Sequence, residues 1–332
     1  MIENWRDLRQ SDVYAARQRI AGLVTRTPLI RAHELSHRLG GEIWFKLETL
    51  QATGAFKLRG ATNALSCLTE AQRACGVTCV SSGNHGRALA YASQAMGVRA
   101  IICLSSLVPA IKVEGIQRFG AEARVHGDSQ DTAQLEVGRL VRDEGMVEVN
   151  PFDDPYVIAG QGTIGLEILE DMPDADQVIV PLSGGGLISG IALAIKSATA
   201  TMQVHGVTMA DGPAMYESLR AGHPVNVIET PTLADALSGG IGPDNRFSFD
   251  LTRRYVDDSH LVNEAAIERA LSWLYFEERL IAEGGAAVAV AALLEGRVSA
   301  AGKTTVVVVS GRNIDMDKLT KIIAAKPHLN FA

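Results

Sequence analysis

Short apolar runs alternate along the chain with longer runs in which apolar positions recur at helical spacing. The short runs predict buried strands, and the longer runs predict helices that cover a sheet. Strands are predicted at residues 43–47, 77–80, 99–104, 122–126, 146–149, 177–180, 204–209 and 304–309. Helices are predicted at residues 12–22, 61–68, 87–96, 109–119, 130–144, 156–169, 187–197, 215–220, 264–278 and 284–294. Because strand and helix alternate, we expect parallel sheets.

The order of these elements divides the chain into two parts. A length of 332 residues suggests about two domains. We expect an α/β fold with two open parallel-sheet domains. The smaller domain covers residues 76–149 and is inserted in the larger domain, which is built from residues 1–75 and 150–332. Residues 222–250 are rich in glycine and proline and are expected to be the least regular part.

Charge and hydropathy exclude several classes of function. The formal net charge is -7 and no block of lysine or arginine stands out, which argues against nucleic acid as a partner. No apolar run reaches the roughly 18 residues that cross a bilayer, and the polar first residues do not resemble a secretory signal. Cys75 and Cys79 lack a nearby histidine pair, so we expect free thiols there and no zinc site. These features predict a cytoplasmic location.

Residues 53–61 contain the first candidate for chemistry, Lys57. This lysine stands between Phe56 and Leu58, and the small residues before it leave room for a flat group. Desolvation lowers the pKa of a lysine and makes its amine a nucleophile. A solvated lysine in a glycine turn before a helix is the alternative that this stretch alone leaves open.

Residues 183–186, with the sequence Ser-Gly-Gly-Gly, lie between an apolar strand and a helix. The backbone N–H groups of such a loop favour a phosphate group. The loop lacks the lysine of a P-loop and the spacing of a dinucleotide-binding fold, so a nucleotide is disfavoured. A tight turn that packs the helix on the strand is the alternative. Residues 81–85 and 310–313 also follow predicted strands, where open parallel sheets bind ligands.

A reactive lysine combined with a phosphate loop suggests pyridoxal phosphate, because its aldehyde binds an amine and its phosphate needs a cup. Four motifs occur in order: E-T-L-Q-A-T-G-A-F-K-L-R-G-A, S-S-G-N-H-G, S-G-G-G-L and V-S-G-R-N. In these motifs and their spacing, the chain from about residue 14 to 318 resembles the serine/threonine dehydratase and serine racemase family. The resemblance implies the tryptophan-synthase β-subunit fold (fold type II) and pyridoxal 5'-phosphate as cofactor.

The resemblance also implies a role for each matching residue. Lys57 matches the Schiff-base lysine, and Ser82 matches a hydroxyl that acts as acid or base on the opposite face. Asn84 matches the residue that bonds the phenolic oxygen of the ring, and Ser310 the hydroxyl beside the pyridine nitrogen. The other expected cofactor contacts are Phe56, Ser183, Gly184, Gly185, Gly186 and Leu187. The expected substrate-binding loop consists of Ser81, Ser82, Gly83, Asn84 and His85.

Some positions depart from the pattern of the family. Ala55 replaces a frequent serine, and Ser183 replaces the first glycine of the phosphate loop, where its hydroxyl could donate to the phosphate. Thr208 and Ala214 stand where some relatives have metal-binding carboxylates, so we expect no metal there.

Ser310, unlike an aspartate, does not hold the pyridine nitrogen as a strong cation, which favours elimination over transamination.

Other polar residues are expected to have structural roles. Glu283 begins a small-residue helix, where helix electrostatics explain it as well as catalysis does. Asp153 and Asp154 precede a proline and predict a turn instead of a paired acid site. The remaining histidines are expected to be scattered and either structural or exposed: His33, His37, His126, His205, His223 and His260.

These observations favour an enzyme that dehydrates a β-hydroxy-α-amino acid and releases ammonia. A racemase that uses Lys57 and Ser82 on opposite faces and a non-catalytic amino-acid-binding protein are the alternatives, and the intact Asn84 argues against the latter. Segments such as F-D-D-P-Y-V-I-A-G-Q-G-T-I-G-L-E and V-S-G-R-N-I-D-M-D most resemble hydroxyectoine-utilisation dehydratases. That resemblance implies a ring-opened hydroxyectoine derivative as substrate. Members of the wider family are usually dimers, so we expect a homodimer, and the short stretch after Ser310 is expected to leave no room for the regulatory domain of biosynthetic threonine deaminases.

Overall fold

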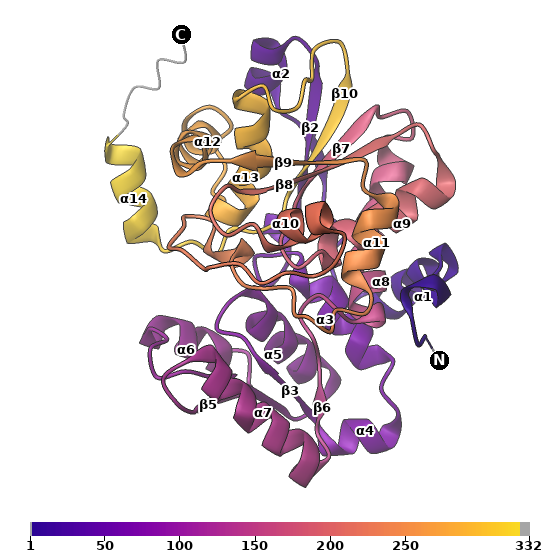
Figure 1. Ribbon diagram of the computed structural model, residues 1–332, viewed down its shortest axis with the longest axis vertical. Helices are drawn as coiled ribbons and strands as arrows, with labels where there is room; N and C mark the ends of the chain where they lie inside the picture. Colours follow the sequence, from indigo (N-terminus) through magenta and orange to yellow (C-terminus); the bar gives the residue numbers. More distant parts are fainter. Residues whose placement is uncertain (1, 326–332) are drawn as a thin grey trace.

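The computed structural model describes residues 2–325 and forms two lobes, each built around one sheet (Figure 1). The larger sheet has the strand order β1-β2-β10-β7-β8-β9, and the smaller sheet has the order β5-β4-β3-β6. Among the described strands, every pairing is parallel except that of β1 with β2. The predicted α/β class with parallel sheets is therefore confirmed.

All strands of the smaller sheet come from one continuous part of the chain. They are β3 (Val77–Val80), β4 (Ala100–Leu104), β5 (Glu122–Val125) and β6 (Val147–Glu148). The larger sheet combines segments from both sides of it. Its strands are β1 (Leu29–Arg31), β2 (Glu42–Leu47), β7 (Gln177–Pro181), β8 (Gln203–Met209), β9 (Asp258–Val262) and β10 (Thr304–Val309).

Helices cover both faces of the larger sheet, as the central strand β10 shows. Its residues Val306 and Val308 pack on the side of α8 and α9, while Val307 and Val309 pack on the side of α12 and α13. A strand buried on both faces is apolar at every position, and the run of valines reflects this. The helices of the larger lobe are α1 (Gln10–Ile20), α2 (His33–Leu39), α8 (Pro155–Asp171), α9 (Gly186–Ala198), α10 (Ala214–Ala221), α11 (Ser248–Tyr255), α12 (Glu264–Phe276), α13 (Gly284–Leu294) and α14 (Met316–Ala325).

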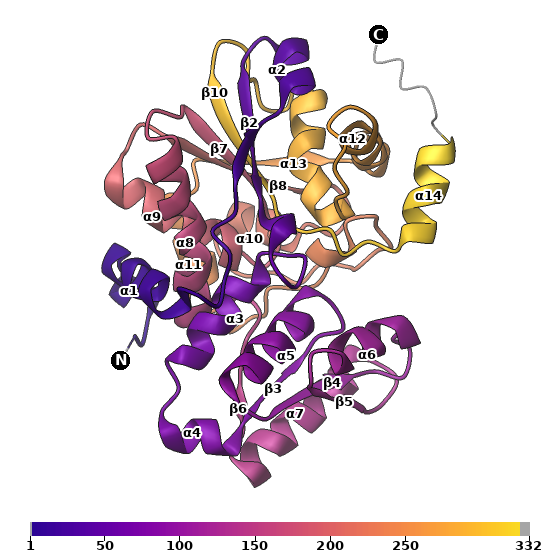
Figure 2. The ribbon, with the colours of Figure 1, turned by 180° about the vertical axis from the view of Figure 1, so that it is seen from behind.

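Helix α3 (Lys57–Ser66) lies at the junction of the lobes, packed against α5 and α8 (Figure 2). Its Leu58 and Leu65 share one apolar cluster with Val77 and Leu104 of the smaller sheet. The helix that begins at Lys57 is thus buried between the lobes. The helices of the smaller lobe are α5 (Asn84–Met96), α6 (Ala110–Gln117) and α7 (Gln130–Glu144), and α4 (Glu70–Cys75) connects α3 to the first strand of that lobe. Short 3-10 turns are η1 (Trp5–Asp7), η2 (Glu48–Leu50) and η3 (Asp235–Leu237).

The loops that follow β2, β3 and β10 meet at this junction. The N–H group of Phe56 donates to the carbonyl oxygen of Ser310 at 3.0 Å. The Asn84 amide, which begins α5, donates to Glu283 of the larger lobe at 2.7 Å. No described helix is both long and apolar enough to cross a membrane.

The structure differs from the predicted elements mainly where helices begin in the candidate loops and at the edges of the sheets. Helix α3 begins at Lys57 and α5 at Asn84, both earlier than predicted, because each helix starts inside the candidate loop itself. The hydrophobic pattern also missed α2, α4, α11, α14 and β9. Strand β9 has a single neighbour in the sheet and only two strongly apolar residues, so its pattern is weak.

Candidate active site

Lys57 is the first residue of α3 and is half-buried, with its amine directed into the junction of the lobes. The amine donates to the carbonyl oxygen of Pro151 at 2.5 Å and lies 5.2 Å from the centre of the Phe56 ring. Burial lowers the pKa of Lys57 to about 8, although Cys79 and Glu283 act in the opposite direction. The partial positive charge at the start of the helix also favours the neutral amine. The structure therefore argues against the solvated-lysine alternative.

Residues 81–85 connect β3 to the amino end of α5. The Ser81 hydroxyl accepts a hydrogen bond from the N–H group of Gly83 at 3.3 Å. Gly86 packs so tightly under this turn that a Cβ atom there would lie 2.1 Å from the Ser81 carbonyl oxygen. Helix α5 has 13 residues and no acidic residue in its first turn. Its first N–H groups can therefore hold a carboxylate, with the half-buried Ser82 beside them.

The His85 side chain anchors this loop to the smaller sheet. His85 is buried, and its Nε2 lies 2.8 Å from the carbonyl oxygen of Val149. Burial and the charge of Lys57 lower the pKa of His85 to about 3, so the ring is neutral near pH 7 and donates to Val149. Nε2 is thus occupied, whereas Nδ1 is buried and has no hydrogen-bond partner among residues 2–325.

The glycine loop after β7 passes directly over Phe152. A Cβ atom at Gly184 would lie 2.4 Å from the Phe152 ring, and one at Gly186 would lie 2.7 Å from the Phe152 carbonyl oxygen. Gly185 has a φ of 87°, which favours glycine. The hydroxyl of Ser183 donates to the carbonyl oxygen of Leu237 at 2.9 Å instead of remaining free for a phosphate. The anion site expected here is therefore formed by backbone N–H groups at the start of α9, which continues with the buried Leu187.

Ser310 directly follows β10 and is buried. Its carbonyl oxygen accepts the N–H group of Phe56, and Ala55 forms a β-bridge with Gly311. These contacts fix the segment before Lys57 to the end of the central strand. The hydroxyl of Ser310 is uncharged, but a carboxyl lies nearby, because a Cβ atom at the adjacent Gly311 would be 2.6 Å from Oε1 of Glu283.

A buried network next to the site joins residues that sequence reasoning did not combine. Glu283 accepts hydrogen bonds from the Asn84 amide at 2.7 Å and from the Asn313 N–H group at 3.1 Å. The Asn313 amide donates to Asn84 at 2.7 Å and to the Thr53 carbonyl oxygen at 2.8 Å, and Arg87 donates to Asn313 at 2.9 Å. Burial raises the pKa of Glu283 to about 7.

Glu283 is thus part of a hydrogen-bonded network at the junction of the lobes, and its side chain forms no capping hydrogen bond at the start of α13. Asn313 stands in the motif V-S-G-R-N, so its place in the motif could have identified it. Glu283 and Asn84 are 199 positions apart in the chain, and no local pattern connects them.

The remaining sequence expectations concern turns and metal ligands. Asp154 caps α8 by accepting from Tyr156 and Val157, which confirms the turn. Asp153 accepts three N–H groups at the start of α11. The Thr208 hydroxyl donates to the sulfur of Met209, and Ala214 begins α10, so neither position supplies a carboxylate.

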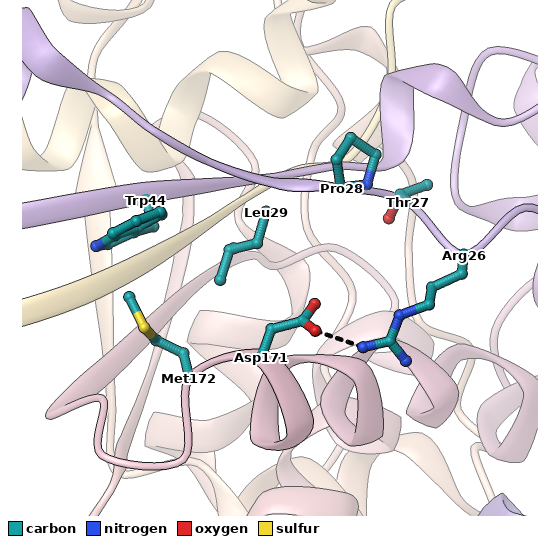
Figure 3. A pocket seen from close by; sticks show the side chains of 7 residues that line it. All are labelled: Arg26, Thr27, Pro28, Leu29, Trp44, Asp171 and Met172. Atoms are coloured by element: carbon teal, nitrogen blue, oxygen red, sulfur yellow. Dashed lines mark hydrogen bonds and ion pairs between the residues drawn. The ribbon is translucent and has the colours of Figure 1, made fainter.

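A separate pocket of about 420 Å³ lies on the larger lobe, between β1, β2 and the end of α8 (Figure 3). An ion pair between Arg26 and Asp171 lies along its wall. None of the predicted site residues lines it, so it is distinct from the junction of the lobes. Its lining residues are Arg26, Thr27, Pro28, Leu29, Trp44, Asp171 and Met172.

Comparisons with known proteins relate this chain to enzymes that use pyridoxal phosphate. The family model described as "Pyridoxal-phosphate dependent enzyme" matches residues 20–311. A Sinorhizobium fredii protein named "Putative threonine dehydratase" is 50% identical over 317 residues, which cover 96% of both chains. The "L-threonine ammonia-lyase" of Thermotoga maritima is 41% identical over 94% of this chain and 77% of its own. The solved structure of maize serine racemase has a TM-score of 0.88 at 33% identity, covering 96% of this chain and 98% of that one.

Proposed function

The chain belongs to the family of pyridoxal-phosphate dependent enzymes and is a lyase of the threonine dehydratase type; from this premise we propose that it removes water and then ammonia from a β-hydroxy-α-amino acid. The observation that carries the proposal is the enclosed amine of Lys57, with its pKa lowered to about 8, at the junction where α5 begins. Such an amine can bind the cofactor aldehyde and, once released from it, accept the α proton.

The residues present fit pyridoxal phosphate. A Cβ atom at Gly184 or Gly186 would overlap Phe152, so glycine lets the loop pack closely there, and the first turn of α9, which has no acidic residue, can offer its N–H groups to a phosphate. Lys57 supplies the amine, and Ser310 supplies an uncharged hydroxyl for the pyridine nitrogen. When bound, the cofactor holds the substrate amine and withdraws electrons from its α carbon.

The protein's own groups account for the rest of the elimination. The N–H groups of residues 81–85 hold the substrate carboxylate and thereby orient the α hydrogen of the substrate toward Lys57. Lys57 accepts the α proton, the bond between the β carbon and its hydroxyl breaks, and the hydroxyl leaves as water with one proton. The released enamine then takes up water and yields a keto acid and ammonia. The proton that Lys57 gains balances the proton that the leaving water carries away.

A racemase is the second candidate, because the chain keeps Ser82 and is 33% identical to maize serine racemase. In that reaction Lys57 and Ser82 exchange protons on opposite faces of the α carbon. The neutral Ser310 supports elimination over transamination but does not distinguish racemisation. Chiral chromatography of the remaining amino acid, run beside a keto-acid assay, separates the two reactions.

The narrower substrate proposal is the ring-opened form of hydroxyectoine or its acetylated derivative. The α nitrogen of intact hydroxyectoine lies in a ring and is not a primary amine, so it cannot bind the cofactor. Threonine and serine have the required amine and hydroxyl, and the names of two relatives support threonine as a substrate class. A pocket built for a polar tail would discriminate against both, because its own polar groups would remain unpaired.

The test measures ammonia and keto-acid release from the ring-opened compounds, threonine, serine and intact hydroxyectoine at matched concentrations. We expect release from the β-hydroxy amino acids with a free α amine, highest for the ring-opened compounds, and none from the intact ring. A far higher kcat/KM for threonine or serine contradicts the narrower proposal alone. No release from any of them contradicts the dehydratase proposal.

We also propose the organisation around this reaction. Residues 76–149 form the substrate-side domain, and residues 1–75 with 150–332 form the cofactor domain. The protein acts in the cytoplasm as a homodimer on a small amino-acid substrate, without nucleic acid or membrane. Sedimentation of the cofactor-loaded enzyme tests the dimer, because a monomeric mass at working concentration contradicts it.

A further inference from the structure

The structure brings His205 and His260 together, although sequence analysis expected the histidines to be scattered. Strands β8 and β9 pair in parallel, with His205 opposite Asp258 and Val207 opposite His260. Residues two apart on a strand share a face. His205, Asp258 and His260 therefore project on the face where Val207 packs with α12 and α13. They lie toward the amino end of β8, whereas the candidate loops follow the carboxyl ends of the parallel strands.

The distances within this group suit a single bound ion. His205 Nδ1 lies 3.2 Å from His260 Nε2, and His260 Nε2 lies 3.6 Å from Asp258 Oδ2. One ligand atom from each of the three residues lies within 4.8 Å of the other two. Nitrogen and oxygen ligands about 2.1 Å from a tetrahedral zinc ion are roughly 3.4 Å apart. Three such ligands leave the fourth position to water on the side of the exposed Asp258.

A simple hydrogen-bonded histidine pair explains the group less well. A hydrogen bond between His205 Nδ1 and His260 Nε2 pairs the two rings but leaves Asp258 outside the pair. The 3.6 Å between His260 and Asp258 is too long for a hydrogen bond.

We propose that His205, His260 and Asp258 bind one divalent first-row transition-metal ion, for which zinc is the reference, at the β8–β9 edge of the larger sheet. Imidazole and carboxylate together match the ligand preferences of zinc and its neighbours better than those of calcium or magnesium. Strand β9 is an edge strand, and an ion shared with β8 ties it to the sheet. The site is distinct from the positions of Thr208 and Ala214 and takes no part in the elimination.

The test compares cofactor-loaded wild type with His260→Gln and Asp258→Asn, in which one ligand is lost at a partly or fully exposed position. His126→Gln, which changes an exposed histidine of the smaller lobe, is the matched control. Each protein is equilibrated with Zn²⁺, dialysed against metal-free buffer and analysed for bound metal by mass spectrometry. We expect about one ion per chain in wild type and in the control, and a strong loss in the other two.

Two further readouts make the outcome decisive. Added Zn²⁺ should raise the Tm of wild type and of His126→Gln, but not that of His260→Gln, and should leave kcat/KM unchanged in all of them. Co²⁺ should give visible ligand-field bands in wild type that disappear in Asp258→Asn. Zinc that wild type and His260→Gln retain equally, or a wild type that retains none, overturns the proposal.

Discussion

Two buried polar networks flank the segment that carries Lys57, and they differ in whether their carboxylates are bonded to cations. In the first network Arg59 bonds Glu48 at 2.9 and 2.8 Å and Glu167 at 2.6 and 2.9 Å. Lys46 adds a contact to Glu167 at 2.6 Å. Two cations thus meet two carboxylates, all of them buried. We call this group the balanced network.

The second network, formed by Glu283, Asn84 and Asn313, has one carboxylate and two amides. Among the described residues, no lysine or arginine bonds Glu283 directly, and the nearest bonded cation is Arg87 on the far side of Asn313. We call this group the uncompensated network. It borders the place where the cofactor is proposed to bind, whereas the balanced network lies behind α3.

The two glutamates show what the difference does. Burial raises the pKa of Glu48, but Arg59, Thr27 and Lys46 outweigh that effect and lower it. Burial raises the pKa of Glu283 to about 7, since the Asn84 and Asn313 hydrogen bonds offset it only in part. Equal burial therefore gives opposite shifts, and the presence of a bonded cation decides the sign. The balanced network therefore keeps its charges fixed, whereas Glu283 can change charge near neutral pH.

The largest effect is expected from removing the amine between the networks. Lys57→Ala should abolish turnover and the visible absorbance of the bound cofactor, because no other group replaces the enclosed amine. Absorption spectra and keto-acid assays measure both. Lys318→Ala, which changes an exposed lysine of α14, is the control and should behave as wild type. An unchanged cofactor band in Lys57→Ala contradicts the assignment.

Breaking the balanced network should cost the most stability. Arg59→Met leaves Glu48 and Glu167 buried without their bidentate partner, and we expect a loss of about 3–5 kcal/mol in the free energy of unfolding. Urea denaturation measures it. Arg17→Met removes the partner of Glu170 in an exposed pair, where about 0–1 kcal/mol is expected. Equal losses in the two variants would show that the buried charges are not mutually dependent.

The uncompensated network should reveal itself as a pH dependence. The pKa of Glu283 in the folded state, about 7, lies above its usual value of 4.5, so the native state binds more protons between these values. Stability contributed by this group is therefore present at low pH and falls, by about 3 kcal/mol at most, as the pH rises through that window.

Glu283→Gln should flatten this part of the profile, because the amide does not titrate. Urea denaturation of cofactor-free wild type and Glu283→Gln from pH 4.5 to 8 tests it. Parallel profiles for the two proteins would mean that Glu283 is ionised throughout. Glu229→Gln, which changes an exposed glutamate outside both networks, controls for effects of net charge.

The smallest effect on turnover is expected from chelation. Thr208 and Ala214 supply no carboxylate at the positions where some relatives bind a metal. EDTA should therefore leave kcat/KM unchanged in a continuous keto-acid assay. A large loss of activity that magnesium or calcium restores would show that a metal acts at the active site.

Sequence reasoning found the parts of the site that are local in the chain. The strand before Lys57 and the loops at residues 81–85 and 183–186 each carry their own signature of apolar run, turn and helix. The networks are different, because Glu283 meets Asn84 across 199 positions and Arg59 meets Glu167 across 108. Their meeting depends on how the two lobes and α8 pack, and no spacing in one sequence encodes that.

The position of a strand in the sheet explains why β10 was predicted and β9 was not. The central strand β10 is buried on both faces and was predicted with its observed bounds. Edge strand β9 contacts one neighbour and has polar residues at three of its five positions, so periodicity did not reveal it. The pairing of β9 with β8 is also what brings His205 to His260, which no pattern in either strand predicts.

The most direct test of the account is to locate the cofactor on the chain. Borohydride reduction of the loaded enzyme fixes pyridoxal phosphate on the amine that holds it, and digestion with mass spectrometry identifies the modified peptide. We predict a single modification at Lys57, close to one per chain, that Lys57→Ala abolishes. Modification of another lysine, such as Lys46 or Lys112, or none at all, would contradict the claim that Lys57 binds the cofactor.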